Sequence, residues 1–271
     1  MIIKDQRNLN PLQFAWKALA GAPQVMRCAH RFKNWNSVVG QYVRPSSFVE
    51  SSIATGRENF EIQLWEPSDV QTVWAVFCNC NYQVPEAPAV VLDLGANIGT
   101  FSIYAAKVKH AKRIIALEPV ASTFAKLQKN ISANGLDSIV TCVQQGIGAA
   151  PGTRTIYKGT SSPHSSMYFR GDPKFESGQT ETIEITTLQS LLDRFNLSSV
   201  DVCKADCEGG EVEALLAASD DVLRKIRLIT MEYHFPGNIS DKSAFFGRLE
   251  HAGFELAWHS NVGKMATFVR K

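Results

Sequence analysis

The sequence predicts an α/β protein with a doubly wound, mostly parallel sheet. From about Val90 onward, short apolar runs alternate with amphipathic segments, which is typical of a parallel sheet covered by helices on both faces. A glycine-bracketed turn follows the first apolar run, where open α/β sheets bind ligands. The last two apolar runs are separated only by the turn sequence "SNVGK", which is too short for a crossover helix. They should therefore form a hairpin, so that one strand in the edge region runs antiparallel.

The first half of the alternation begins with the apolar run "VVLDL". This run predicts a buried strand over Val90–Leu94, and the segment after the glycines predicts a helix over Thr100–Val108. "RIIAL" predicts a second strand over Arg113–Leu117. An amphipathic stretch predicts a helix over Ala121–Ala133, which the turn "NGLD" ends, and a third strand follows over Ile139–Val143.

The second half repeats the pattern. Leucines recur on one face after Thr187, so a helix capped by Thr187 should extend through Phe195. Apolar and β-branched runs predict the later strands, and amphipathic segments predict the helices between them. These elements are expected as strand Val200–Ala205, helix Glu211–Ala218, strand Ile226–Tyr233, helix Lys242–Ala252, and the closing strands Phe254–His259 and Lys264–Val269.

Two regions stand outside the alternation. Residues 1–88 predict an N-terminal cap, with helices around Leu12–Ala20 and Val70–Asn79, the second announced by the capping sequence "PSD". Residues 89–271 are expected to form the ligand-binding domain. Within it, residues 148–184 are rich in Gly, Ser and Pro, which predicts an insertion of extra strands joined by a mobile loop.

Composition narrows the class of protein. The chain has 271 residues, of which 45% are hydrophobic, and its net charge of +2 is too small to favour a nucleic-acid partner. No apolar run approaches the roughly 18 residues that span a bilayer, and the first residues lack the apolar core of a secretory signal. The expectation is a cytoplasmic protein without a membrane span; its oligomeric state is not predicted.

The segment "LDLGANIGTF" carries the first functional prediction. It lacks the Gly-x-Gly-x-x-Gly pattern with which backbone approaches a dinucleotide pyrophosphate, and an aspartate precedes its first glycine. A ligand with both an ammonium and a carboxylate group suits it better, and S-adenosylmethionine has both. The cofactor-binding residues predicted here are Asp93, Gly95, Ala96, Asn97, Gly99 and Thr100.

The ends of the next two strands extend this prediction. The second strand ends in "IALEP", which places Glu118, followed by Pro119, where a carboxylate accepts hydrogen bonds from ribose hydroxyls. Gln145 and Gly146 follow the third strand and would border the adenine. Each feature has a structural alternative, since acidic residues and turn glycines end many strands.

A second group of polar residues follows the fourth and fifth strands. "VDVCKADCEGGEVEALLAA" crowds Lys204, Asp206, Glu208 and Glu211 where a buried strand meets a helix. Glu208 and Glu211 fit the positive end of a helix, but buried charges such as Lys204 and Asp206 are costly unless paired. The fifth strand ends in "ITMEYHF", whose alternation puts Glu232 and His234 on one side.

These motifs together resemble the FkbM family of S-adenosylmethionine-dependent O-methyltransferases. The resemblance rests on "VLDLGANIGTFSIYAA", "ALEP", "TLQSLLDRF", "VDVCKADCEGGEVEAL" and "MEYHF", and it extends from about Val90 to His234. It implies a class I methyltransferase sheet of seven strands with the last strand inserted antiparallel. It also implies methyl transfer to hydroxyl groups, commonly of sugars or secondary metabolites. Cys203, Cys207 and Gly210 depart from the usual family residues.

Methyl transfer to a hydroxyl group requires removal of its proton, and His234 is the predicted general base because histidine titrates near neutral pH. Asp206, Glu208 and Glu232 are predicted either to orient the acceptor or to hold a divalent cation such as Mg²⁺ through oxygen ligands. Two alternatives remain: His234 is purely structural, or His164 in "SSPHSS" is the base.

Two other functions compete with the O-methyltransferase. An NAD(P)-dependent oxidoreductase is disfavoured because the chain lacks the dinucleotide glycine pattern and a recognisable Tyr-x-x-x-Lys. A non-catalytic S-adenosylmethionine-binding protein is disfavoured by the acidic residues after the fourth and fifth strands. The predicted acceptor is a small-molecule or carbohydrate hydroxyl compound, and no nucleic acid is expected.

Overall fold

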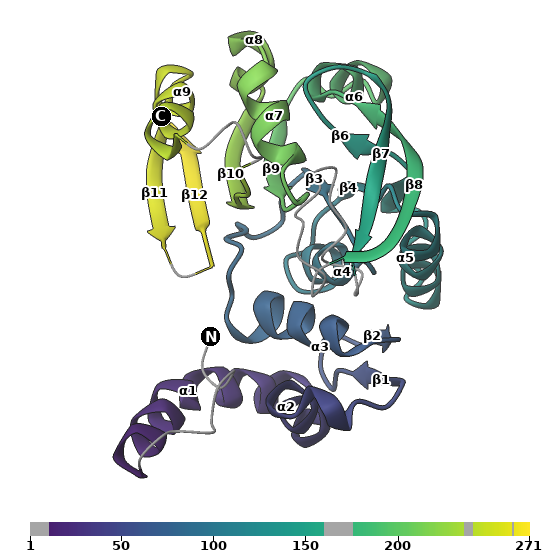
Figure 1. Cartoon of the computed structure of the whole chain (residues 1–271), viewed down its shortest axis with the longest axis vertical. Coiled ribbons are helices and arrows are strands. Elements are labelled where there is room, and N and C mark those ends of the chain that lie inside the picture. Colours follow the sequence, from purple (N-terminus) through teal and green to yellow (C-terminus); the bar gives the residue numbers. More distant parts are fainter. Residues whose placement is uncertain (1–10, 160–175, 236–240, 262) are drawn as a thin grey trace. The chain divides into compact units, whose positions relative to one another are not determined.

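The computed structural model describes residues 11–159, 176–235, 241–261 and 263–271. The chain divides into two compact units, one ending at Asn81 and the other comprising Tyr82–Lys271. Figure 1 shows the order of their elements. The second unit contains the alternating strands and helices that the sequence predicts.

The first unit is built from short helices and a strand pair. Its last helix begins at Pro67, where proline needs no hydrogen-bond partner, and the Asp69 carboxylate accepts hydrogen bonds from the backbone N–H groups of Trp65 and Glu66 at 2.8 and 3.1 Å. The two predicted helices are present, whereas α2 and the antiparallel pair β1–β2 were not predicted because they are short. The elements are α1 (Pro11–Arg31), α2 (Trp35–Val43), η1 (Pro45–Ser47), β1 (Ser51–Ala54), β2 (Glu61–Leu64), α3 (Pro67–Val73) and the π-helical turn η2 (Trp74–Cys78).

A seven-stranded sheet forms the centre of the second unit. Its strands lie in the order β11-β12-β10-β9-β3-β4-β5, and β12 alone runs in the opposite direction to the other six. β12 forms a hairpin with β11 and lies between β10 and β11, so that β11 is the edge strand. The strands are β3 (Val90–Leu94), β4 (Arg113–Leu117), β5 (Val140–Val143), β9 (Val200–Ala205), β10 (Ile226–Glu232), β11 (Phe254–Ser260) and β12 (Met265–Arg270).

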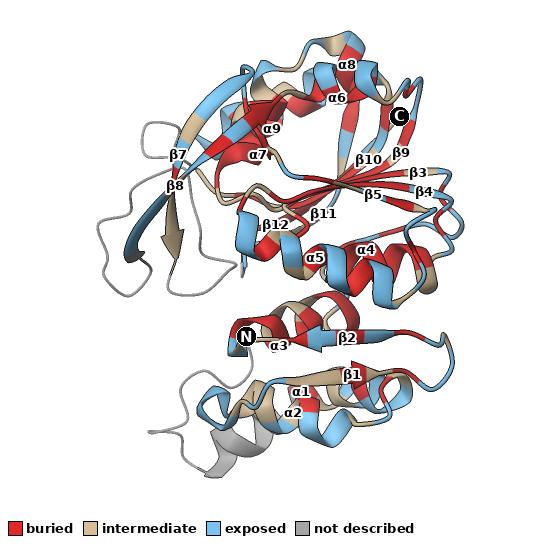
Figure 2. Ribbon diagram, turned by 90° about the vertical axis from the view of Figure 1, so that its right-hand side faces the viewer, coloured by how far each residue is buried: buried red, intermediate tan, exposed pale blue. Residues whose placement is uncertain are grey.

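Helices cover both faces of this sheet (Figure 2). One face carries α4 (Thr100–Lys107) and α5 (Ala121–Ala133). The other carries α6 (Leu188–Arg194), α7 (Gly210–Ala217), α8 (Asp220–Arg224) and α9 (Lys242–His251). The central strands are therefore buried on both sides, which explains why they are continuous apolar runs without a polar alternation.

A smaller sheet follows β5. It has three strands in the order β6-β8-β7, formed by β6 (Gly146–Ile147), β7 (Gly152–Gly159) and β8 (Glu176–Thr186). These are extra strands of the kind predicted for residues 148–184. The loop predicted to join them falls largely on residues 160–175, which lie outside the described residues.

The predicted fold class is confirmed: the sheet is mostly parallel, seven-stranded and covered on both faces, and one strand beside its edge runs antiparallel. The insertion of the last strand also agrees with the class I methyltransferase sheet that the family resemblance implies. In the parts of the chain that the structure describes, no helix combines the length and the apolar character needed to cross a bilayer.

Candidate active site

The candidate site lies at the carboxyl ends of the central strands of the seven-stranded sheet. β4, β3, β9 and β10 are parallel neighbours, so their carboxyl ends meet there. The turn after β3 carries the glycines, and β4 is followed by Glu118. β9 is followed by Asp206, and β10 ends at Glu232. The sheet order therefore brings together polar residues that are distant in the sequence.

The glycine turn after β3 is fastened to the end of β4. The N–H groups of Gly95 and Ala96 both donate to the carbonyl oxygen of Leu117, at 3.0 and 2.7 Å. Gly95 has a φ of +76°, and a Cβ atom there would overlap the backbone oxygen of Asp206. Only glycine fits a turn pressed so closely against the neighbouring strand end.

Helix α4 starts from this turn. Gly99, with a φ of +89°, precedes its first residue, and a Cβ atom at Gly99 would lie 2.8 Å from Cδ1 of Leu127. Thr100 begins the helix, and its buried hydroxyl oxygen has no hydrogen-bond partner among the described residues. The N-terminus of α4 thus offers first-turn N–H groups and a hydroxyl group beside the turn.

Glu118 is a buried carboxylate that supports the same turn. Its two oxygens accept hydrogen bonds from the N–H groups of Asn97, at 3.0 Å, and Val120, at 3.1 Å. Burial raises the pKa of Glu118, the two N–H groups oppose this effect, and the resulting pKa is about 7. Asn97 is itself at a φ of +50°, a conformation that asparagine tolerates better than most residues.

Asp93 pairs with a lysine from the neighbouring strand. Oδ1 of the fully buried Asp93 lies 3.2 Å from Nζ of Lys204, and Oδ2 accepts a hydrogen bond of 2.7 Å from Ser102. Lys204 also donates to the carbonyl oxygens of Leu94 and Gly95, at 3.3 and 2.7 Å. The cation beside Asp93 is therefore supplied by the protein; direct contact between Asp93 and a cofactor stays a prediction.

The charge on Lys204 is maintained by its neighbours. Burial alone would lower the pKa of Lys204, but the carboxylates of Asp93 and Asp206 outweigh burial and raise it. A protonated lysine thus ties the glycine turn to β9. Lys204 is thus paired, as the sequence predicts for a charge at a buried strand end.

Asp206 lies directly against the glycine turn. Its backbone N–H donates to the carbonyl oxygen of Leu94 at 3.1 Å, and its Oδ2 accepts a hydrogen bond of 2.8 Å from the hydroxyl of Tyr82. The side chain is partly exposed, in contrast to Asp93. Asp206 is therefore placed between the turn after β3 and the end of β10.

The turn after β9 folds around the carboxylate of Glu211. Oε2 of this fully buried side chain accepts hydrogen bonds from the N–H groups of Cys207, at 3.1 Å, and Gly209, at 3.0 Å. Oε1 accepts from the backbone N–H of His234 at 2.6 Å and lies 3.2 Å from its Nδ1. Glu211 thus holds both the turn and His234.

Three carboxylates surround the imidazole of His234. Besides Glu211 at Nδ1, its Nε2 lies 3.5 Å from Glu232 and 3.7 Å from Glu208. Burial by itself would lower the pKa of His234, but the hydrogen bonds to Glu211 and Glu232 outweigh it and raise the pKa to about 11. The imidazole in this arrangement is protonated at neutral pH.

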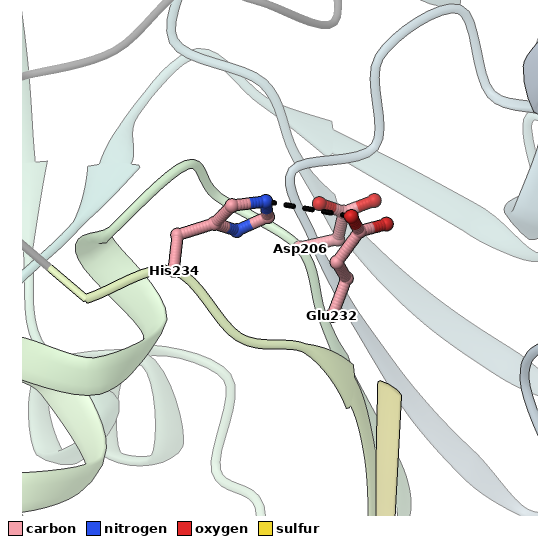
Figure 3. Close-up of side chains that lie close together, drawn as sticks. All are labelled: Asp206, Glu232 and His234. Carbon is pink, nitrogen blue, oxygen red and sulfur yellow. Dashed lines mark ion pairs between the residues drawn. The ribbon is translucent and has the colours of Figure 1, made fainter. Parts of the chain in front are cut away.

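The side chains of Asp206, Glu232 and His234 converge (Figure 3). One potential ligand atom from each lies within 4.8 Å of the other two. Two carboxylates and an imidazole are suitable ligands for a divalent cation. The sequence predicted Asp206, Glu208 and Glu232 as metal ligands; of these, Glu208 lies outside this group of three and instead approaches His234.

The other predicted residues lie at the margins of the site. Gln145 extends away from the turn after β3: its side-chain amide contacts Glu184 at 3.1 Å and Arg194 at 3.2 Å. Gly146 belongs to β6 and packs against Ile185, so close packing accounts for this glycine. Pro119 is partly exposed beside Glu118. His164, the alternative base, lies outside the described residues.

Sequence reasoning missed parts of the site. Tyr82 precedes the first core strand and belongs to no motif, so no signal pointed to it. Glu211 was assigned to a helix terminus. Its position in "CEGGE", just after a buried strand, also indicated a role at the carboxyl ends of the strands. Lys204 was noticed as a costly charge, but its partner Asp93 was assigned to the ligand.

A family model and several known proteins match this chain. A family model described as the methyltransferase FkbM domain matches residues 93–256. Methyltransferase sdnD of Sordaria araneosa is 24% identical over 209 residues, covering 67% of this chain and 80% of that protein. AMB antimetabolite synthetase AmbE of Pseudomonas aeruginosa is 26% identical over 183 residues, which cover 54% of this chain but only 8% of AmbE.

Among solved structures, the methyltransferase FkbM from Methylobacillus flagellatus KT aligns with a TM-score of 0.48 and 15% identity. The alignment covers 97% of this chain and 63% of that one.

Proposed function

Because the chain belongs to the FkbM family of S-adenosylmethionine-dependent methyltransferases, we propose that it transfers the methyl group to a hydroxyl oxygen of a sugar or another small metabolite. The observation that carries this proposal is that two sets of polar residues meet at the carboxyl ends of the central strands. The glycine turn with Glu118 suits the donor, and Asp206, Glu232 and His234 beside it suit the deprotonation of an acceptor.

The donor would be held by groups of complementary charge. Glu118 would accept hydrogen bonds from the ribose hydroxyls, while the first turn of α4, including Thr100, would donate to the methionine carboxylate. Asp206 would bind the ammonium group, because it lies against Gly95 and, unlike Asp93, is not paired with the buried Lys204. This arrangement uses both charged ends of the donor.

Proton removal is best assigned to Glu232. The sequence predicts His234 as the base, but an imidazole whose pKa is raised to about 11 already carries its proton at neutral pH. Burial raises the pKa of Glu232, which makes its carboxylate a stronger base, and its Oε1 lies 3.5 Å from Nε2 of His234. His234 would then act as a hydrogen-bond donor that orients Glu232.

The pH dependence of turnover distinguishes the two bases. With Glu232 as the base, the rate rises as this carboxyl group ionises and shows no second rise when His234 loses its proton near pH 11. Glu232→Gln then lowers kcat by about 10²-fold or more, because general base catalysis contributes about 10²-fold to 10⁴-fold. A rate that continues to rise towards pH 11 and is abolished by His234→Gln alone would instead assign the base to His234.

A divalent cation is the alternative to a protonated His234, because an imidazole must lose its proton to bind a metal ion. It would be held by Asp206, Glu232 and His234, whose ligand atoms are close enough together. Such an ion would act as a Lewis acid that lowers the pKa of the acceptor hydroxyl. Titration with Mn²⁺, compared between the wild type and Glu232→Gln, tests binding; S-adenosylhomocysteine titration in the presence of a chelator tests the donor site independently.

The methyltransferase proposal is tested by label transfer. The protein is incubated with methyl-labelled S-adenosylmethionine and a panel of sugars, glycans and metabolite extracts, with and without Mg²⁺. We expect label in a hydroxyl-bearing fraction, and Glu232→Gln serves as the variant that retains donor binding but loses transfer. Binding of NAD without binding of S-adenosylmethionine would replace the proposal with the oxidoreductase alternative, and donor binding without transfer to any acceptor would favour a binding protein.

A further inference from the structure

The segment that precedes the first core strand is tied to the sheet at several points. We call residues 82–89 the tether segment. The N–H of Gln83 donates to the hydroxyl of the buried Thr230 at 3.2 Å. Further along, the N–H of Ala87 donates to the carbonyl oxygen of Lys109 at 2.7 Å, and that of Ala89 donates to Asp201 at 2.7 Å. Backbone contacts therefore fix this segment at both ends.

Tyr82 begins the tether segment and turns its ring into the site. The side chain is buried, its ring packs edge-to-face against Phe101 at 5.6 Å between centroids, and Nζ of Lys204 lies 5.6 Å from the ring centroid. Burial, followed by the charges of Asp206 and Glu232, raises the pKa of Tyr82, so the phenol keeps its proton. Its hydroxyl donates to Oδ2 of Asp206 at 2.8 Å.

We propose that Tyr82 is a positioning residue for methyl-donor binding: its hydroxyl group holds one oxygen of Asp206, and the carboxylate is thereby oriented towards the donor's ammonium group. This inference rests on the proposed function, specifically on the assignment of Asp206 to the donor. It extends the site to a residue outside the motifs that carry the family resemblance. The ring fixes the direction of the hydroxyl, and the tether segment fixes the ring.

The test is a double-mutant cycle on binding, with S-adenosylhomocysteine as the probe and calorimetry as the measurement. Tyr82→Phe removes only the hydroxyl group and keeps the ring contacts with Phe101 and Lys204. We expect Tyr82→Phe to weaken binding about tenfold, as loss of a residue that orients a ligating group does. In the Asp206→Asn background the same change should alter affinity by less than about twofold, because the carboxylate it orients is gone.

Tyr233→Phe is the matched control. Tyr233 is also a buried tyrosine, and its hydroxyl lies 3.1 Å from Nε2 of His259, so the substitution also removes a phenol contact. Its ring packs against Phe246 of α9 and His259 of β11, and not against the Tyr82–Asp206 pair. We expect the affinity for S-adenosylhomocysteine to be unchanged.

The outcomes separate the inference from the function on which it rests. If the wild type does not bind S-adenosylhomocysteine, or Asp206→Asn binds as well as the wild type, the donor-site proposal fails. If Asp206→Asn weakens binding but Tyr82→Phe does not, or Tyr82→Phe weakens it equally in both backgrounds, only the inference is overturned.

A second measurement applies if Tyr82→Phe does not fold. Protein with 3-fluorotyrosine at position 82 should show a fluorine resonance that shifts both with Asp206→Asn and on addition of S-adenosylhomocysteine. A resonance that responds to neither overturns the inference.

Discussion

At the scale of single residues, the site depends on carboxylates whose surroundings set their charge. Asp93 is fully buried but faces a lysine, Glu118 is buried against two backbone N–H groups, and Glu211 is buried against a histidine and a turn. Burial raises the pKa of Glu118, and different partners surround the carboxyl group in each case. The same residue type therefore serves as an ion-pair partner at Asp93 and as a positioning group at Glu211, and we propose that at Glu118 it accepts hydrogen bonds from the ligand.

Glu118 leads to a prediction about pH and donor binding. Its pKa in the free protein is raised to about 7. Hydrogen bonds from the ribose hydroxyls would stabilise the ionised form and so lower this pKa in the complex. Affinity for S-adenosylhomocysteine should therefore be constant above about pH 7 and fall by up to about tenfold per pH unit below it. Calorimetry across this range measures the effect.

The control for this prediction is Glu118→Gln, which cannot ionise at this position. It should bind more weakly at pH 8 and lose the pH dependence around pH 7. A wild-type affinity that is flat between pH 8 and pH 5.5 would contradict the assignment of Glu118 to the ribose.

His234 leads to a second prediction at this scale. The imidazole should stay protonated between about pH 5 and pH 9, where an ordinary histidine loses its proton. Because its pKa is raised in the folded state, its contribution to stability is complete below the unfolded pKa of 6.5 and is lost as pH rises towards about 11. NMR of histidine labelled in the ring follows the titration.

Two comparisons make the measurement decisive. Glu211→Gln removes a carboxylate that raises the pKa, so His234 should then titrate at a lower pH. His259, whose pKa burial lowers, supplies a second histidine that should titrate below 6.5 in the same spectra. Titration of His234 near 6.5 in the wild type would contradict the site as described.

At the scale of elements, the turn after β3 determines how the donor site is built. Gly95 has a φ of +76°, and its Cα faces the backbone of Asp206. Gly95→Ala should lower the free energy of unfolding by more than the about 1–2 kcal/mol that a left-handed conformation costs. It should also abolish binding of S-adenosylhomocysteine, because either the turn or β9 must move. Urea unfolding and calorimetry measure the two effects.

Gly135→Ala is the reference substitution for this prediction. Gly135 has a similar φ of +62°, but no atom lies within 4 Å of the position that a Cβ atom would occupy. Its substitution should carry only the cost of the backbone conformation and leave binding intact. Equal losses of stability at both positions would show that the contact with Asp206 is unimportant.

The sequence predicted most elements of the second unit because their signals are local, although it missed the short helix α8. Apolar runs such as Val90–Leu94 and Val200–Ala205 are buried on both faces, and caps such as Thr187 mark helix starts. α2 and the pair β1–β2 were missed, since they are short and depend on packing within the first unit. Local pattern does not report such dependence.

The site was predicted less completely, for a related reason. Residues at strand ends were identified because chain position and sheet order suffice to place them together. The contacts between these side chains were not predicted, because they depend on the direction of each side chain. Lys204 contacts Asp93, and Gln145 contacts Glu184. The charge state of His234 could not be predicted either, since Glu211, Glu208 and Glu232 reach it from two different strand ends.

At the scale of the whole molecule, donor binding should stabilise the second unit. A ligand that binds only the folded state adds about 2.7 kcal/mol when present at 100 times its Kd. S-adenosylhomocysteine at that excess should therefore raise the melting temperature, whereas NAD at the same concentration should not. Differential scanning calorimetry of the full chain measures both, and Gly95→Ala is the control that should lose the shift. Stabilisation by NAD alone would contradict the proposed donor.

The sheet order has a consequence for synthesis on the ribosome. β10, which carries Glu232, obtains its outer neighbour only from Met265–Arg270, although β11 is translated before that strand. Until Met265–Arg270 has left the ribosome, the flank of β10 therefore stays open. An unpaired, apolar strand border should thus persist until that strand emerges, and chaperone binding to the nascent chain should be strongest before then.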